Sequence, residues 1–401
     1  MDIAVSGVSG SASQTRKGQQ RNAPVSPTSG FFFTSPFRSL VTEGCFSRVT
    51  TPAADGDNLQ GEFQQVVKQA LASARRAGIA HPVLCGAIPF DTRQPSSLFI
   101  PQDVQWIERQ DVLSQPATTT TGSADILSLR ELPLQQEFMQ MVSDAVAATS
   151  APQLDKIVLS RLLEIETQQP LDRHALMTRM IVQNPLGYHF HVPLEQGALF
   201  GASPELLLRK SGNQFYSNPL AGSARRERDS QQDNAVSRAL LSSSKDLYEH
   251  RVVTQGMQQV LASRSRHLHI PDSPELLSTP TLWHLSTPID GEVADSAENA
   301  LSLACLLHPT PALCGSPMLA ARDLIAELEP FDRGLFGGIV GWCDEQGNGE
   351  WVVTIRCGTV DANRVRLFAG AGIVPDSCPQ SEWRETGVKL NTMLRALGLD
   401  Q

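Results

Sequence analysis

The stretch from Gly334 to Val374 constrains the fold more than any other part of this 401-residue chain. It holds nine glycines, spread through short apolar segments in which the side chains alternate between two faces of an extended backbone. Such alternation is typical of β-strands, and glycine at this density allows tight turns and close backbone approach. We therefore expect short strands joined by turns, which favours antiparallel sheets over alternating βαβ units.

Helical patterns lie outside this stretch. Apolar residues recur at helical spacing over 63–77 and 134–148, and in one long helix over 231–263. Residues 114–124 are polar and predict a linker. Further strands are expected over 155–165, 188–192, 198–201, 205–209 and 214–217. The sequence therefore predicts an α+β fold, and its length alone allows one to three domains.

The chain is acidic, with a formal net charge of −9 and no basic block. Nucleic acids and anionic membranes are recognised by clustered positive charge, so neither is an expected partner. Its apolar runs are shorter than the ~18 residues of a membrane span, and its N-terminus lacks the apolar segment of a secretory signal. Seven cysteines without C-x-x-C spacing argue against a zinc site or a disulfide framework. We expect a cytoplasmic protein.

Near the C-terminus, one face of an expected helix carries Glu382, Glu385 and Lys389. The ordinary interpretation is a solvent-exposed pairing of opposite charges. Two observations favour a functional site instead, since Trp383 lies inside the motif and a glycine-interrupted apolar run, 368–374, comes just before it. Two buried carboxylates repel each other unless a cation compensates, and oxygen ligands suit a hard ion such as Mg2+.

Two further charged residues stand beside apolar strands. Lys156 is either a strand-edge residue with its ammonium in solvent, or a general base whose pKa is lowered by partial burial. Glu205 enters a leucine-rich strand after a turn, and it is either an edge charge or a carboxylic acid kept protonated by apolar surroundings. The residue pattern alone leaves both alternatives open.

Glu249 and Arg356 also lie among apolar residues. Glu249 is on the longest expected helix, with Val252 and Val253 placed so that its carboxylate is on or beside the buried stripe. A third acidic ligand for the cation predicted above would explain it. Arg356 follows a strongly apolar strand, where it either captures a ligand carboxylate or forms an internal salt bridge.

Six spaced segments together resemble the signatures of the chorismate-utilising enzymes. They follow one another in the family's order, as residues 201–205, 219–226, 308–313, 329–338, 370–374 and 382–385. Segments 31–36 and 86–90 further resemble the isochorismate synthases of catecholate siderophore pathways. The resemblance implies a single domain over residues 31–401, with a β-sandwich-like core of mostly antiparallel sheets flanked by helices. Residues 1–30 lie outside it and are expected to form a disordered arm.

The resemblance also implies a reaction, the Mg2+-dependent conversion of chorismate to isochorismate, which feeds 2,3-dihydroxybenzoate and catechol siderophore synthesis. Lys156 matches the lysine that activates water for addition at C2, and Glu205 matches the acid at the departing C4 hydroxyl. Glu249 and Glu385 match the Mg2+ ligands, with Glu382 acting directly or through water.

The predicted substrate contacts follow from the same resemblance. Arg356, Lys389 and the backbone around Gly370 match contacts to the carboxylates of chorismate, and the remaining predicted contacts are those of Gly222, Ala312, Leu313 and Phe336. Because chorismate is a dianion, Mg2+, Arg356 and Lys389 would supply positive charge that the acidic protein lacks overall.

Three alternatives remain. A salicylate synthase would share the fold, but relatives of that type carry threonine at the position of Ala312. An ammonia-using relative such as anthranilate synthase needs an amidotransferase subunit and usually has a different sequence at 219–226. A catalytically silent binding protein would not be expected to keep all of the proposed catalytic and metal-binding residues. We expect a monomer without an amidotransferase partner.

Overall fold

The computed structural model describes residues 28, 30–113 and 125–399. The expected linker, 114–124, and the expected N-terminal arm, apart from residues 28 and 30, lie outside the described residues. None of the helices in the described ranges combines the length and the apolar character that a membrane crossing requires.

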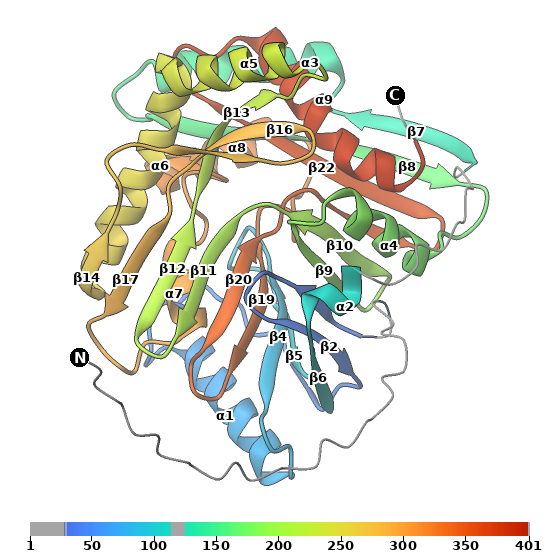
Figure 1. The fold of residues 1–401 in the computed structure, drawn as a ribbon, viewed down its shortest axis with the longest axis vertical. Helices are drawn as coiled ribbons and strands as arrows, with labels where there is room; N and C mark the ends of the chain where they lie inside the picture. Colours follow the sequence, from blue (N-terminus) through green and yellow to red (C-terminus); the bar gives the residue numbers. More distant parts are fainter. Residues whose placement is uncertain (1–27, 29, 114–124, 400–401) are drawn as a thin grey trace, which may run out of the picture.

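Two large sheets and one small sheet make up the β structure (Figure 1). The ten-stranded sheet has the order β18 (Gly315–Ser316), β8 (Lys156–Thr167), β22 (Arg364–Ile373), β21 (Cys357–Asp361), β10 (Ala198–Ser203), β9 (Tyr188–Pro193), β1 (Phe32–Thr34), β2 (Ser39–Glu43) and β6 (Asp103–Ile107), and β7 (Ile126–Leu132) also pairs with β8. The expectation of antiparallel pairing is confirmed throughout the described strands.

The other two sheets lie beside the first. The nine-stranded sheet has the order β14 (Ser265–His269), β17 (Ile289–Val293), β12 (Gln214–Asn218), β11 (Leu206–Ser211), β20 (Gly349–Val353), β19 (Ile339–Asp344), β4 (Val83–Ile88), β5 (Ser97–Ile100) and β3 (Ser47–Val49). The small sheet has the order β13 (Leu220–Arg225), β16 (Leu282–Ser286) and β15 (Glu275–Ser278).

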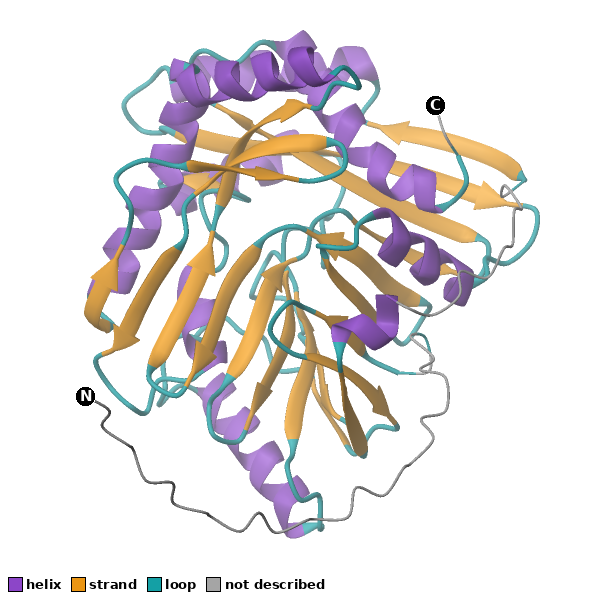
Figure 2. Ribbon diagram, viewed as in Figure 1, coloured by secondary structure: helices purple, strands orange, loops and turns teal. Residues whose placement is uncertain are grey.

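Helices flank these sheets (Figure 2). The ten-stranded sheet is contacted by α3 (Gln135–Thr149), α4 (Arg173–Gln183), α8 (Met318–Leu328) and α9 (Pro379–Ala396). The nine-stranded sheet is contacted by α1 (Glu62–Arg76) and α7 (Ala300–Leu307), and the small sheet by α5 (Ser230–Ser242) and α6 (Ser244–Ala262). The short α2 (Arg109–Leu113) follows β6.

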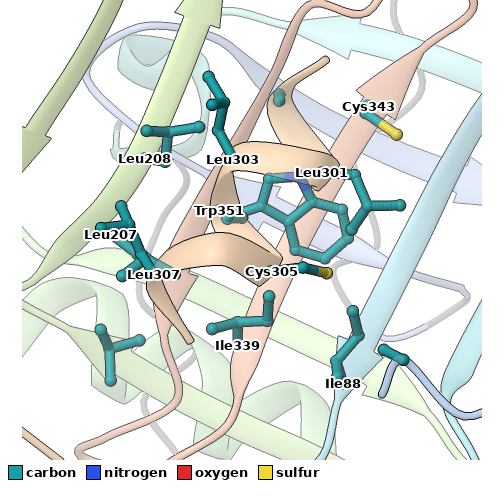
Figure 3. Close-up of a cluster of buried hydrophobic side chains, with 14 of the residues drawn as sticks. Ile88, Leu207, Leu208, Leu301, Leu303, Cys305, Leu307, Ile339, Cys343 and Trp351 are labelled. Carbon is teal, nitrogen blue, oxygen red and sulfur yellow. The ribbon is translucent and has the colours of Figure 1, made fainter. Parts of the chain in front are cut away.

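The nine-stranded sheet is buried on both faces, as β20 illustrates. Trp351 and Val353 belong to the apolar cluster that includes α7, whereas Val352 belongs to the cluster between the two large sheets. Figure 3 shows Trp351 among Leu301, Leu303 and other apolar side chains. Because successive strand residues point to opposite faces, a strand with apolar layers on both sides needs a continuous apolar sequence. The predicted β-sandwich-like core with flanking helices is the arrangement found.

The prediction of one long helix over 231–263 is wrong. The chain forms α5 and α6, which are separated at Ser243, where the backbone is extended. The Ser243 side chain accepts a hydrogen bond from the backbone N–H of Asp246 and so caps α6. Serine side chains compete with the helical backbone for hydrogen bonds, so the run from Ser242 to Ser244 favours a break that apolar periodicity alone does not reveal.

Candidate active site

A cavity lies where the small sheet, the start of β8, the end of β22, α6 and α9 meet. Ten of the twelve predicted site residues line it, namely Glu205, Gly222, Glu249, Ala312, Leu313, Phe336, Arg356, Gly370, Glu385 and Lys389. The other two lie next to it, since the Lys156 ammonium contacts Glu249 and Glu382 is one turn before Glu385 on α9. The fold therefore gathers all twelve in one place.

The register between β8 and β22 brings Lys156 to the cavity. The strands run antiparallel, so that Val158 lies opposite Gly372 and Ser160 opposite Gly370. A Cβ atom on Gly372 would be 2.0 Å from Glu249 Oε1 and 2.9 Å from Lys156 Cε. Only glycine leaves this space, which is why a carboxylate from α6 can rest directly on the strand.

Lys156 is fully buried, with 0% of its side chain exposed, and its Nζ atom is 2.9 Å from Glu249 Oε1. The two groups are close, but they are not aligned as a hydrogen bond. Complete burial excludes the strand-edge interpretation, in which the ammonium reaches solvent. The role of general base stays a prediction.

Glu205 is also buried, in the turn between β10 and β11. The backbone N–H of Leu220 donates a hydrogen bond of 3.3 Å to Glu205 Oε1. Burial raises the pKa of Glu205 to about 7, against the smaller opposing effects of this hydrogen bond and of nearby cations. A carboxyl group of this kind holds a proton near neutral pH and can donate it.

Three lysines accompany the three predicted metal-binding carboxylates. Besides the contact of Lys156 with Glu249, Lys245 Nζ lies 2.8 Å from Glu382 Oε1, and Lys389 Nζ lies 2.6 Å from Glu385 Oε1. Only 1% of Glu382 is exposed, so its pairing with Lys245 is not the solvent-exposed pairing that was the ordinary interpretation of the sequence.

The two carboxylates of α9 differ in their affinity for protons. Burial and the charge of Glu385 raise the pKa of Glu382 to about 7. Burial acts in the same direction on Glu385, but Lys389 and Lys245 outweigh it, so that the pKa of Glu385 is lowered. Ser223 Oγ also donates to Glu385 Oε1 at 3.1 Å, whereas the buried Oε2 of Glu382 accepts no hydrogen bond.

Within the described ranges, no three His, Cys, Asp or Glu side chains are arranged as a ready metal site. The carboxylates of Glu249, Glu382 and Glu385 are each held by an ammonium group instead. The donor set nevertheless consists of oxygens that suit a hard cation, and one oxygen of Glu382 is buried without a partner. The residues therefore fit Mg2+ in chemistry, provided that the ammonium contacts give way.

Arg356 and Lys389 bring positive charge into the cavity. Arg356 follows β20 with a φ angle of 48°, and burial lowers the pKa of its guanidinium to about 10. Among the described residues it forms no ion pair, so the internal salt bridge considered above is not found. Lys389 Nζ donates to the carbonyl oxygen of Gly370 at 2.8 Å. A ligand carboxylate would find two cations here.

Part of the cavity lining is apolar. Ala312 and Leu313 belong to the turn between α7 and β18, and Phe336 precedes β19. The ring of Phe336 stacks on that of Phe368, with a centroid distance of 5.0 Å and an interplanar angle of 9°. Such a wall suits the face of a flat ring.

The sequence analysis missed other residues that line the cavity. His284 on β16 is buried, burial lowers its pKa well below the usual value, and its Nε2 atom has no hydrogen-bond partner. The sequence feature that could have indicated His284 is a histidine inside the apolar strand Leu282–Ser286. Ser223 was also missed, although it lies within segment 219–226. A second cavity of about 410 Å3 shares Pro204 and Arg356 with the first.

Comparison with known proteins identifies the family of this chain. Residues 100–398 match the family model described as chorismate binding enzyme. The chain is 57% identical over 383 residues to isochorismate synthase EntC of Escherichia coli (strain K12), covering 95% of this chain and 97% of that protein. It is 40% identical over 377 residues to isochorismate synthase DhbC of Bacillus subtilis (strain 168), covering 92% and 94% of the two chains.

A solved structure resembles the fold over nearly its whole length. It is that of a putative 2,3-dihydroxybenzoate-specific isochorismate synthase, DhbC from Bacillus anthracis, with a TM-score of 0.85 and 38% identity, covering 94% of this chain and 97% of the other. Both the sequence and the fold therefore place this chain in the chorismate-binding enzyme family.

Proposed function

We propose that the protein is an isochorismate synthase that supplies isochorismate for 2,3-dihydroxybenzoate and catechol siderophore synthesis. The observation that carries this proposal is the identity of 57% to isochorismate synthase EntC over 95% of the chain. The cavity supports it, because a buried carboxylic acid, two cations and apolar side chains line it, and a buried lysine lies next to it.

In the proposed reaction, Lys156 in its neutral form takes a proton from water as the water oxygen bonds to C2 of chorismate. The double bond migrates, the bond from C4 to its hydroxyl breaks, and Glu205 donates a proton to the departing oxygen. One water is added and one is lost, so that the product is an isomer of the substrate. The nucleophile is water and not ammonia, so no amidotransferase subunit is needed.

The remaining residues would hold and orient the dianion. Arg356 and Lys389 would bind its carboxylates, and Gly370 and Gly222 would allow the backbone to approach them. Ala312, Leu313 and Phe336 would contact the ring.

Glu249 and Glu385 would hold Mg2+, with Glu382 binding it directly or through water, and the ion would neutralise charge on a substrate carboxylate. Loading would then require Lys156, Lys245 and Lys389 to leave their present carboxylate partners. Release from Glu249 would also free the Lys156 amine for its proposed role.

The test is to incubate the purified protein with chorismate and Mg2+ and to separate the products by chromatography with mass detection. Isochorismate should be the main product, it should not form with EDTA, and the Lys156→Ala variant should form it about a hundredfold or more slowly. Anthranilate or salicylate as the main product, or binding of chorismate without turnover under any divalent cation, would overturn the proposal.

A further inference from the structure

We infer that the buried ion pair of Glu329 and Arg333 is a positioning element of the active site, which fixes strand β8 against the apolar wall of the cavity. This inference rests on the proposed function. Both residues lie in segment 329–338, and neither the sequence analysis nor the proposed mechanism assigns a role to either of them.

The first observation is a gap along one edge of β8. One edge of this strand pairs with β22 over its length, while the other is shared by two strands. On that edge β18 pairs with Lys156 and Ile157, and β7 pairs from Leu162 onwards. The four residues between them, 158–161, have no strand partner there, although the backbone N–H of Val158 donates to the carbonyl oxygen of Cys314 at 2.9 Å.

The ion pair fills this gap. Arg333 Nη2 donates to the carbonyl oxygen of Val158 at 2.7 Å, and the backbone N–H of Ser160 donates to Glu329 Oε1 at 2.7 Å. The two side chains thus take the place of a missing strand, with one donor and one acceptor. An unpaired backbone group at a buried position is costly, so these bonds hold the strand in register.

Arg333 also connects three residues that line the cavity. Besides its bond to Val158, its Nη1 atom donates to the carbonyl oxygen of Leu313 at 2.8 Å. Its own carbonyl oxygen accepts from the backbone N–H of Phe336 at 2.9 Å. One residue therefore fixes the distance between the strand that begins at Lys156 and the wall formed by Leu313 and Phe336.

The pair itself is almost fully buried, with side-chain exposures of 1% for Glu329 and 3% for Arg333. Arg333 Nε donates to Glu329 Oε2 at 2.8 Å, and Nη2 donates to Oε1 at 2.6 Å. A buried ion pair adds little net stability over apolar residues of the same size. Its directional bonds to several elements point to positioning as its contribution, since the guanidinium presents its donors in a fixed plane.

The experiment compares Arg333→Lys and Glu329→Gln with a matched control pair. Lysine keeps the charge but cannot reach all four acceptors, and glutamine loses one of the two acceptor oxygens. The controls are Arg264→Lys and Glu298→Gln, which alter an Arg–Glu pair with a buried glutamate and a partly exposed arginine, and neither residue lines the cavity. Melting temperature, kcat, and the Kd of chorismate from calorimetry are measured for all four variants.

We expect kcat to fall about 10- to 100-fold in the Arg333 and Glu329 variants while the Kd of chorismate changes less than about threefold, because the cations remain but the ring is misplaced. The control variants should keep kcat within about twofold of the parent at temperatures where they are folded. If kcat fell equally in the site variants and in the control variants, in proportion to the fall in melting temperature, the Glu329–Arg333 pair would contribute only to stability. That result would overturn the inference.

A second measurement does not depend on activity. Exchange of the Ser160 amide hydrogen should be faster in both site variants than in the parent. Glu329→Gln changes the carboxylate that accepts from this amide, and Arg333→Lys removes the Nη2 hydrogen bond that holds the same carboxylate oxygen in place. Exchange at Leu163, which pairs with Leu367, should be unchanged. Unchanged exchange at Ser160 would contradict the inference, even where kcat had fallen. A parent protein that does not convert chorismate would refute the proposed function, while this measurement would still decide the inference.

Discussion

Replacing Gly372 by alanine tests the most tightly packed contact of the site. The added Cβ would lie 2.0 Å from Glu249 Oε1, and such contacts are essentially never shorter than 3.0 Å, so the carboxylate has to retreat by at least 1.0 Å. Lys156 Cε, at 2.9 Å, is also displaced. A misplacement of about 1 Å can cost about a hundredfold in rate, so we expect kcat/KM to fall by about that factor. The Mg2+ concentration for half-maximal activity should rise as well.

The matched control is Gly387→Ala on α9, close to Glu385. Its Cβ would meet only the far end of the Arg161 side chain, at 3.3 Å, and alanine should stabilise the helix by up to ~1 kcal/mol. Steady-state kinetics across a Mg2+ titration and thermal unfolding are measured for both variants. If Gly372→Ala kept the kcat/KM and the Mg2+ dependence of Gly387→Ala, Glu249 would not be acting from the position that the structure gives it.

Further predictions concern the proposed roles and two buried carboxyl groups. In calorimetric titrations, Glu249→Ala and Glu385→Ala should lose Mg2+-dependent chorismate binding, whereas Lys156→Ala and Glu205→Ala should keep binding and lose about a hundredfold or more in kcat; normal turnover of Lys156→Ala would contradict the assignment. Because burial raises the pKa of Glu205 to about 7 and the acid acts in its protonated form, kcat/KM should fall as pH rises through about 7; a flat profile from pH 6 to 9 would argue against this role. Glu350 is a buried acid, and burial raises its pKa from the ordinary 4.5 to about 7, so the folded state holds its proton more tightly and loses stability as pH rises between these values. Urea unfolding should show that Glu350→Gln removes a loss on the order of 3 kcal/mol between pH 4.5 and pH 8, and an unchanged pH dependence would rule this out.

The sequence predicted the strands and helices best where the chain has one clear period. The glycine-rich stretch predicted antiparallel strands because its side chains alternate between the two faces of an extended backbone. Strand β8 was expected from its apolar run. The break at Ser243 was missed because it depends on a side chain capping the following helix, while the apolar period continues through it. The apolar pattern does not reveal whether the backbone stays hydrogen-bonded as one helix or breaks at Ser243, where the serine side chain caps the next helix.

The sequence predicted which residues form the site but not the contacts between them. The family resemblance named residues from 156 to 389, and the structure brings them together. No sequence pattern could have paired Lys245 with Glu382, because the two residues are far apart in the chain and the contact joins the first turns of α6 and α9. His284 was missed because one histidine in a strand looks the same whether it faces a cavity or a core.

The lysine contacts of Glu249, Glu382 and Glu385 mean that the site carries its own counter-ions. A divalent cation and a dianion together carry no net charge, so binding both leaves the net charge of the site unchanged. Binding either one alone would leave an excess charge in a buried space, which is costly. The affinities for the two should therefore be thermodynamically coupled, each raising the other by the same factor. Under the proposed mechanism, the concentration of Mg2+ would therefore set the effective affinity for chorismate.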